Sequence, residues 1–252
     1  MNHSIQPIGP DAASVPASSK AGPSLSRREL FGRRGRGRVT SLVSAAGGIA
    51  GTVGGFRASA DTSTDPLFMS STRLAQMIRE KKVSSMEVVQ RHIERIQKVD
   101  PMLNAVVMPC FERALAEAKA ADDALAKGQV KGPLHGVPMT IKDSIETEGV
   151  ISTGGTQGRS HYVPPRDATV VARLRAAGAI LLGKTNTPEF TTGGVSGLGT
   201  TANILYGMTR NPYDPRYTVY GSSGGAGAIV AAGGSSFDIG SDFGGSIRGP
   251  SH

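Results

Sequence analysis

The chain has 252 residues, which is enough for one large domain or two small ones. Its single cysteine, Cys110, excludes an intramolecular disulfide, and its five histidines show no metal-ligand spacing, so we expect neither a metal nor a cofactor. The net charge of +8 is concentrated in residues 1–60, whose eight basic and two acidic residues leave only +2 for the rest, which argues against a nucleic-acid-binding protein.

The N-terminal segment has the pattern of a targeting leader. Residues 1–25 are rich in Ser, Pro, Ala and Gly and lack apolar periodicity, so we expect disorder there. Residues 26–31 (SRRELF) resemble a twin-arginine export motif, and an uncharged, mildly apolar stretch follows over 39–56. Ala58-Ser59-Ala60 then has the small-x-small pattern of a signal peptidase site, with cleavage expected after Ala60.

This order of segments predicts an exported protein, periplasmic or extracellular, that uses the twin-arginine machinery. The apolar stretch is rich in glycine and too weakly hydrophobic for a stable membrane anchor. A disordered basic tail or an organellar transit peptide is the alternative, and a cytoplasmic location stays open. The sequence thus divides into a leader, 1–60, and a body, 61–252.

The body opens with a predicted helical region. Apolar residues at helical spacing predict amphipathic helices over 72–82 and 84–99, the second capped by Ser84 or Ser85. Asp100-Pro101 is expected to stop the second helix, because proline disfavours the helical conformation in the residue before it. An alanine-rich helix follows over 105–127 and ends at Gly128.

Beyond residue 130 short apolar runs alternate with helical segments. Such alternation predicts an α/β fold, a mixed sheet covered by helices on both sides. The segments are a strand over 137–141, a helix over 168–177, a strand over 179–182 ended by Gly183, a helix over 226–232 and a strand over 237–239.

Two segments rich in glycine and serine, 221–227 and 240–249, interrupt this pattern. A flexible linker has the same composition, but linkers do not usually place Asp242 and Arg248 around a small-residue turn between apolar runs. A phosphate-binding loop is excluded, because neither segment has the G-x-x-x-x-G-K-[ST] pattern. Glycines that let backbone amides approach a ligand explain both segments better.

The body resembles the amidase signature family of serine hydrolases, whose motifs occur in order from about residue 72 to 252. Any one Gly-Ser run is a weak signal, but several long motifs in order are specific. The matching blocks are GPLHGVP at 132–138 with Lys142-Asp143, the segment 167–189, GSSGG at 221–225 and GSDFGGSIR at 240–248.

The resemblance implies an amidase signature fold and a catalytic role for three residues. By position, Lys142 matches the base, Ser222 the bridging serine with its cis peptide bond, and Ser246 the nucleophile. The backbone amides of Phe243, Gly244 and Gly245, with that of Ser246, match the oxyanion hole, which stabilises the charge that develops on the carbonyl oxygen.

The chemistry requires such a set. A serine hydroxyl is a poor nucleophile at neutral pH and needs a base within hydrogen-bond reach, and no histidine lies in either serine block. Lys142 can serve only when neutral, and burial at the end of an apolar strand favours the neutral amine. Ser222 both donates and accepts, as a proton relay must.

The remaining polar residues are expected to support this set. Ser223 and Ser241 are expected to orient their neighbours, while Asp242 and Arg248 form an ion pair or satisfy backbone groups. Cys110 is expected on the third helix as a buried small hydrophobe.

The sequence also departs from the family pattern. Tyr220 replaces a usual glycine, where it either lines the pocket or packs, and Gly249 replaces a usual apolar residue. Family members continue for about two hundred residues beyond the position of His252, so we expect a fragment, truncated after the nucleophile loop.

Three functions compete. The first is hydrolysis of a small-molecule amide through an acyl-enzyme on Ser246. The second is the amidase-type subunit of a tRNA-dependent amidotransferase, which the export signal and the near-neutral body disfavour. The third is a non-catalytic remnant that keeps part of the fold. A homodimer stays open, and the sequence does not identify the amide.

Overall fold

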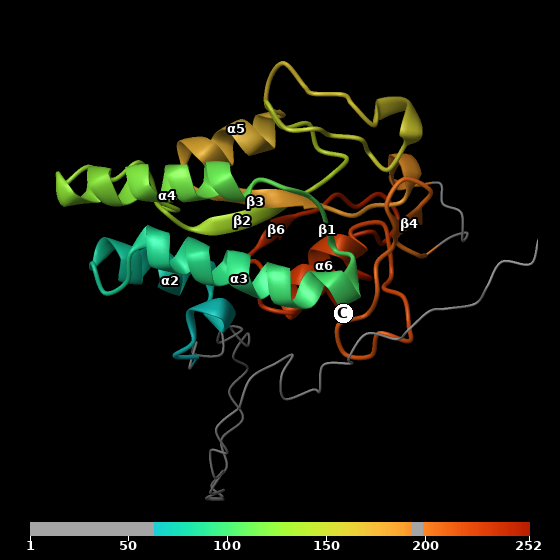
Figure 1. Cartoon of the computed structure of the whole chain (residues 1–252), viewed down its shortest axis with the longest axis horizontal. Helices are drawn as coiled ribbons and strands as arrows, with labels where there is room; N and C mark the ends of the chain where they lie inside the picture. Colours follow the sequence, from blue (N-terminus) through green and yellow to red (C-terminus); the bar gives the residue numbers. More distant parts are fainter. Residues whose placement is uncertain (1–62, 193–198) are drawn as a thin grey trace, which may run out of the picture.

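The computed structural model describes residues 63–192 and 199–252 (Figure 1). The predicted twin-arginine motif and the predicted cleavage site after Ala60 lie outside the described residues. Within the described residues, no helix is long and apolar enough to cross a membrane.

The helical region begins with the short 3-10 helix η1 (Pro66–Phe68), followed by α2 (Ser71–Arg79) and α3 (Ser85–Leu103). Ser70 and Ser84 cap α2 and α3, each by accepting a hydrogen bond from the third backbone N–H that follows. The prediction that α3 stops at Asp100-Pro101 was wrong, because Pro101 lies inside the helix.

The last turn of α3 survives the proline because Asp100 and Asn104 hold its end. The Asp100 carboxylate accepts from the backbone amides of Ala105 and Val106, at 2.7 and 3.0 Å. Asn104 ends the helix in the left-handed conformation, with its N–H donating to Asp100 O. These bonds compensate for the donor that proline lacks.

The third predicted helix is shorter than expected at its start. Residues Val106–Pro109 form strand β1, and helix α4 covers only Phe111–Ala126. Cys110 is therefore the residue before α4, at its N-cap and half-buried, not a residue of the helix. Gly128, with φ 75°, follows the helix in the left-handed conformation that glycine adopts easily.

The central sheet has four strands in the order β1-β3-β2-β6. Strand β2 (Pro138–Lys142) pairs in parallel with β3 (Ile180–Thr185) and with β6 (Asp238–Ile239), while β1 pairs antiparallel with β3. The sheet is therefore mixed, as predicted.

Gly183 does not end β3, contrary to the prediction, but lies inside the strand opposite Pro109. A Cβ at Gly183 would lie 2.8 Å from Met108 O, so only glycine lets β1 approach this closely. The β2–β3 register shifts by one residue just before this point, between Met139 and Thr140. The shift aligns Lys142 with Thr185 and turns Lys184 to the other face.

Helices cover both faces of the sheet (Figure 1). Helix α5 (Thr169–Ala176) packs on the face formed by Met139, Ile141 and Leu181. Helices α3 and α6 (Gly224–Ala231) share a second core with Ile180 and Leu182. The shorter elements are η2 (Gln157–Arg159), η3 (Glu189–Thr191), β4 (Ala202–Asn203) and β5 (Gly207–Met208).

Candidate active site

The site lies at the carboxyl edge of the parallel strands. Lys142 is the last residue of β2, and the segment 240–249 begins where β6 ends. Because β2 and β6 are parallel neighbours, these two ends meet at the same edge of the sheet. Helix α6, preceded by Ser222 and Ser223, packs against β2 and β6. Three segments distant in sequence therefore converge.

The amine of Lys142 is surrounded by the hydroxyls of three serines. Its Nζ lies 2.6 Å from Ser222 Oγ, 3.0 Å from Ser223 Oγ and 3.1 Å from Ser241 Oγ, with Ser241 O at 3.4 Å. The side chain is fully buried. None of these four acceptors is a carboxylate, and among the described residues no carboxylate forms an ion pair with Lys142.

Burial lowers the pKa of Lys142 to about 8, while the charges of Asp238 and Asp242 act in the opposite direction. An ordinary lysine is almost entirely protonated near neutral pH. With a pKa of about 8, Lys142 is neutral in roughly a tenth of the molecules at pH 7 and in most of them above pH 8, and the neutral amine can accept a proton.

Ser222 and Ser223 enter α6 from an irregular backbone. The peptide bond between Gly221 and Ser222 is cis. The Ser223 hydroxyl donates to Ser241 O at 3.2 Å, and the Ser223 N–H donates to Ser246 O at 3.0 Å. Ser223 thus ties the start of α6 to both ends of the loop that carries the candidate nucleophile.

The structure places Ser246 beside this pair without completing the relay. Only its backbone carbonyl is bonded to the serine pair, and within the described residues its hydroxyl makes no hydrogen bond. Catalytic hydrogen bonds are often long or unformed in the absence of substrate. The structure therefore brings Lys142 and Ser222 together and leaves the contact between Ser222 and Ser246 unformed.

Asp242 organises the loop that precedes and follows Ser246. Its carboxylate accepts from the amides of Gly245, Ile247 and Arg248, at 2.7 to 3.1 Å, and pairs with the Arg248 guanidinium at 2.9 Å. The Arg248 hydrogen bond, followed by the three amide bonds, lowers the pKa of Asp242 far below its usual value. The loop is therefore folded around one carboxylate.

The predicted oxyanion donors differ in their availability. The Gly245 N–H is already bonded to Asp242, while within the described residues the amides of Phe243 and Gly244 have no hydrogen-bond partner. The Phe243 side chain is fully exposed, and a Cβ added at Gly244 would meet no atom within 4 Å. Neither amide is therefore engaged by another group in the described part of the chain.

Tyr220 and Gly249, the two departures from the family pattern, lie against each other. A Cβ at Gly249 would lie 2.2, 2.6 and 2.8 Å from ring atoms of Tyr220. The same ring lies over Gly245 and Gly199, whose added Cβ atoms would be in ordinary contact with it at 3.7 and 3.5 Å. The Tyr220 ring thus occupies the space that a side chain at Gly249 would need.

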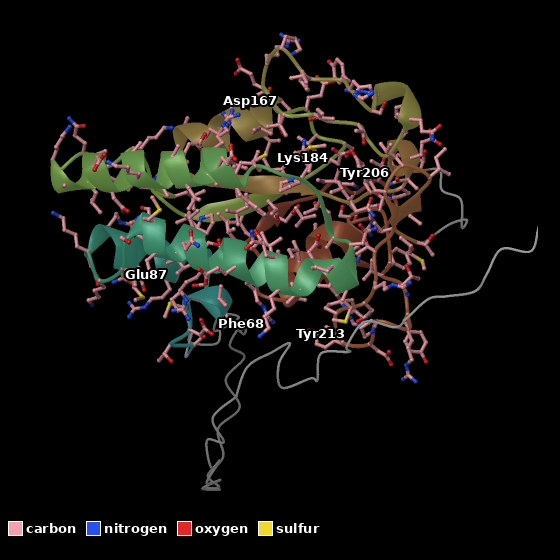
Figure 2. All side chains as sticks on the ribbon, viewed as in Figure 1. Phe68, Glu87, Asp167, Lys184, Tyr206 and Tyr213 are labelled. Atoms are coloured by element: carbon pink, nitrogen blue, oxygen red, sulfur yellow. The ribbon has the colours of Figure 1, made fainter. Side chains whose placement is uncertain are left out.

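A second buried lysine, Lys184, lies on the other face of the sheet. Figure 2 shows it inside the body, on the side of the sheet that carries Asp167. Its Nζ donates to Ile145 O, Thr147 Oγ1 and Ser152 Oγ. Burial lowers its pKa to about 8. No pattern in the sequence distinguished Lys184 from a surface lysine.

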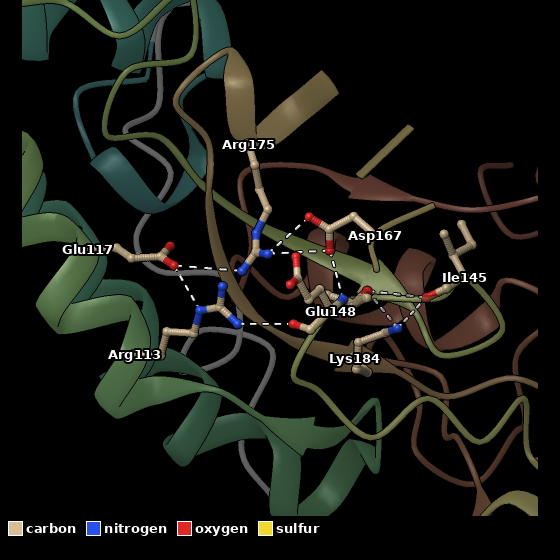
Figure 3. A network of polar contacts seen from close by, with 8 residues as sticks. Arg113, Glu117, Ile145, Glu148, Asp167, Arg175 and Lys184 are labelled. Atoms are coloured by element: carbon tan, nitrogen blue, oxygen red, sulfur yellow. Dashed lines mark hydrogen bonds and ion pairs between the residues drawn. The ribbon is translucent and has the colours of Figure 1, made fainter. Parts of the chain in front are cut away.

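The segment 145–152, which accepts these bonds, also contacts charged residues on its outer side (Figure 3). Glu148 O accepts from Arg113 of α4, and Glu148 N donates to Asp167. Asp167 in turn pairs with Arg175 at 3.0 Å. Lys184 therefore holds the segment 145–152 from its inner side.

Cys110 is remote from this chemistry. Burial raises the pKa of its thiol, which disfavours the reactive thiolate. Within the described residues, no group of three or more His, Cys, Asp or Glu side chains is placed to hold a metal ion.

Comparison with known proteins gives consistent matches. The family model described as Amidase matches residues 87–252. Indoleacetamide hydrolase of Bradyrhizobium diazoefficiens is 47% identical over 183 residues, which are 73% of this chain and 34% of that protein. A glutamyl-tRNA(Gln) amidotransferase subunit of Moorella thermoacetica is 45% identical over 183 residues, 73% of this chain and 37% of that protein.

A solved structure of a bacterial aryl acylamidase of the amidase signature enzymes superposes with a TM-score of 0.69 at 34% identity. The match covers 74% of this chain and 38% of that one. The chain spans a little more than a third of the length of these relatives.

Proposed function

Because this chain belongs to the amidase family, we propose that the protein hydrolyses the C–N bond of small carboxylic amides through an acyl-enzyme on Ser246. One observation carries the proposal: a fully buried lysine, Lys142, whose Nζ lies 2.6 Å from the hydroxyl of Ser222. A buried amine beside a chain of hydroxyls is a base for nucleophile activation. Lys142 differs from the other buried lysine, Lys184, because its hydroxyl partner Ser222 leads into the helix that is bonded to the loop around Ser246.

In the proposed reaction, neutral Lys142 takes a proton from Ser222, which takes one from Ser246. Ser246 Oγ attacks the amide carbon and forms a C–O bond, while the π electrons of the carbonyl move to its oxygen. The amides of Phe243 and Gly244, which have no hydrogen-bond partner within the described residues, can donate to that oxyanion. Gly245 would join them only after releasing Asp242.

The intermediate then collapses. The proton returns through Ser222 to the amide nitrogen, the C–N bond breaks, and ammonia or an amine leaves. Water attacks the acyl ester with help from the same relay and releases the carboxylate. Each step uses groups that lie on Lys142, Ser222 and the loop around Ser246, and none requires a cofactor.

The amidotransferase function is the second candidate, favoured by the 45% identity to the amidotransferase protein of Moorella thermoacetica. The two candidates differ in what they need for turnover. A hydrolase releases ammonia from a simple amide alone, whereas an amidotransferase requires tRNA and a partner protein. We further propose export through the twin-arginine machinery, which is compatible only with the first candidate.

The test is ammonia release from a panel of aliphatic and aryl amides by the complete purified protein, without tRNA or partner. We expect turnover that Ser246→Ala abolishes and that Ser235→Ala preserves, because Ser235 is a buried serine that donates to Phe237 O outside the site. Release only with tRNA and a partner would favour the amidotransferase. No release under either condition would favour a non-catalytic protein.

A further inference from the structure

The proposed reaction gives no role to Asp238, an acidic residue beside the site. Asp238 of β6 is aligned with Thr140 of β2, and Lys142 follows two residues later in β2. Aligned residues of parallel strands project from the same face, and residues two apart in a strand share a face. Asp238, Thr140 and Lys142 therefore project from one face of the sheet.

A hydrogen bond shows where the Asp238 carboxyl lies on that face. Thr185 Oγ1 donates to Asp238 Oδ2 at 3.0 Å, although Thr185 is in β3 and Asp238 in β6, on opposite sides of β2. Neighbouring strands are about 4.8 Å apart, and β3 and β6 are separated by β2. The side chains of Thr185 and Asp238 must therefore extend over the face of β2 to form this bond. Thr185 is aligned with Lys142, and the crossing occurs at the base of the Lys142 side chain.

Asp238 is half-buried as a residue, and one oxygen of its carboxyl, Oδ1, is shielded from water. We propose that the Asp238 carboxylate controls the protonation of Lys142, and through it the pH range in which the proposed hydrolase works. Asp238 touches neither substrate nor nucleophile in this account, so it is a positioning residue that acts through Lys142. The inference rests on the proposed role of Lys142 as base.

The electrostatics of the pair agree with this geometry. Burial raises the pKa of Asp238 to about 6, while the Thr185 hydroxyl and the two buried lysines act to lower it. Burial lowers the pKa of Lys142, and Asp238 is the first of two acids that oppose this. Between about pH 6 and 8, a carboxylate therefore faces an ammonium in a low-dielectric site.

Few other charged groups act on the pair. Asp242, in the loop after β6, also favours the ammonium form of Lys142. Lys184, on β3, acts on Asp238 from the opposite face of the sheet. The aligned strand residues that face the pair, Thr140 and Thr185, are uncharged.

The sign of the effect follows from charge alone. Removing the negative charge of Asp238 leaves the Lys142 ammonium less stabilised, so Lys142 becomes neutral at a lower pH. A nearby opposite charge typically shifts a pKa by about 1 unit or more. Asp238→Asn should therefore move the acidic limb of the kcat/KM profile down by about 1 pH unit. One unit below the wild-type pKa, activity normalised to the plateau should rise about fivefold.

A matched control is Asp100→Asn. Asp100 is a carboxyl whose pKa is raised by burial and which accepts two backbone hydrogen bonds, but it is not among the groups that act on Lys142. This variant should lose stability and leave the limb in place. A limb that moves equally in both variants would overturn the inference, because loosening of the fold would then explain the shift.

A direct titration separates this inference from the proposed function. The 13Cε resonance of Lys142, assigned by comparison with Lys142→Met, reports its protonation whether or not the enzyme turns over. If the resonance titrates at lower pH in Asp238→Asn but the kcat/KM limb stays, Asp238 controls Lys142 and Lys142 is not the base. If the resonance does not move, the inference is wrong.

Should Asp238→Asn not fold, Asp238→Ser provides the same test, because it removes the same negative charge with a smaller side chain. The Lys142 resonance should again titrate at a lower pH than in the wild type. An unchanged or upward shift would overturn the inference.

Discussion

The contact between Tyr220 and Gly249 predicts a coupled pair of substitutions. Gly249 does not adopt a left-handed conformation, so alanine fits its backbone and only the tyrosine ring opposes the new Cβ. That Cβ would lie 2.2 Å from one ring carbon, far inside van der Waals contact. At that distance either the ring or the loop around Ser246 must move, and Tyr220, which is 52% exposed, has solvent on one side.

Overpacking of this kind costs about 1–3 kcal/mol of unfolding free energy. A displacement of the nucleophile loop by about 1 Å can lower kcat/KM by about a hundredfold. Gly249→Ala should therefore reduce both quantities, and the reduction should vanish in a Tyr220→Ala background, where the ring is absent. The expected interaction between the two substitutions is about 0.5–3 kcal/mol.

The assay is a double-mutant cycle, with unfolding free energies from urea titrations and kcat/KM from amide turnover. Gly244→Ala is the matched control for stability, because its added Cβ meets no atom within 4 Å. Additive effects of the substitutions at 220 and 249 would refute the contact as the cause. A loss of stability in Gly244→Ala equal to that in Gly249→Ala would show that loop glycines are needed for flexibility instead.

Three further predictions follow from the site and the leader. Ser246→Ala should reduce amide turnover at least about a thousandfold with an unchanged circular dichroism spectrum; normal turnover by the purified variant would contradict the assignment. The pKa of Lys184 is about 8 in the folded protein and 10.5 for the free group, so between these two pH values the native state binds fewer protons than the unfolded state. The contribution of Lys184 to the unfolding free energy therefore rises with pH in this range, by up to about 1.4 kcal/mol per pH unit. Urea titrations of Lys184→Met should show that slope reduced, and an unchanged slope would argue that Lys184 is not buried. Arg27→Lys with Arg28→Lys should hold the precursor in the cytoplasm, and unchanged secretion in a fractionation assay would rule out the twin-arginine route.

Local periodicity predicted most helices and the central strand, because those signals lie within each segment. It missed β1, whose four residues directly precede an alanine-rich helix and carry no alternation long enough to detect. It also misread Gly183 and Pro101. Glycine usually ends a strand and proline a helix, but here packing of β1 and bonds to Asp100 override those preferences.

Part of the candidate site could likewise be predicted from the sequence and part could not. The contact of Lys142 with Ser222 was predicted from the motifs and their order in the sequence, which identify the catalytic residues without knowledge of the strand order. The position of Asp238 depends on β2 lying between β3 and β6, and no local pattern reveals that order. The one available signal was an acid inside the short apolar run 237–239, where a solvated surface residue would not be expected.

Covalent labelling with a fluorophosphonate tests the central proposal most directly. Attack by Ser246 Oγ would break the P–F bond and form a P–O bond, and mass spectrometry of the digested protein would locate the adduct. The account predicts one adduct, on Ser246, formed faster as pH rises through about 8 and lost in Lys142→Ala. An adduct on Ser222 or Cys110, or undiminished labelling of Lys142→Ala, would contradict the proposed Lys142–Ser222–Ser246 relay.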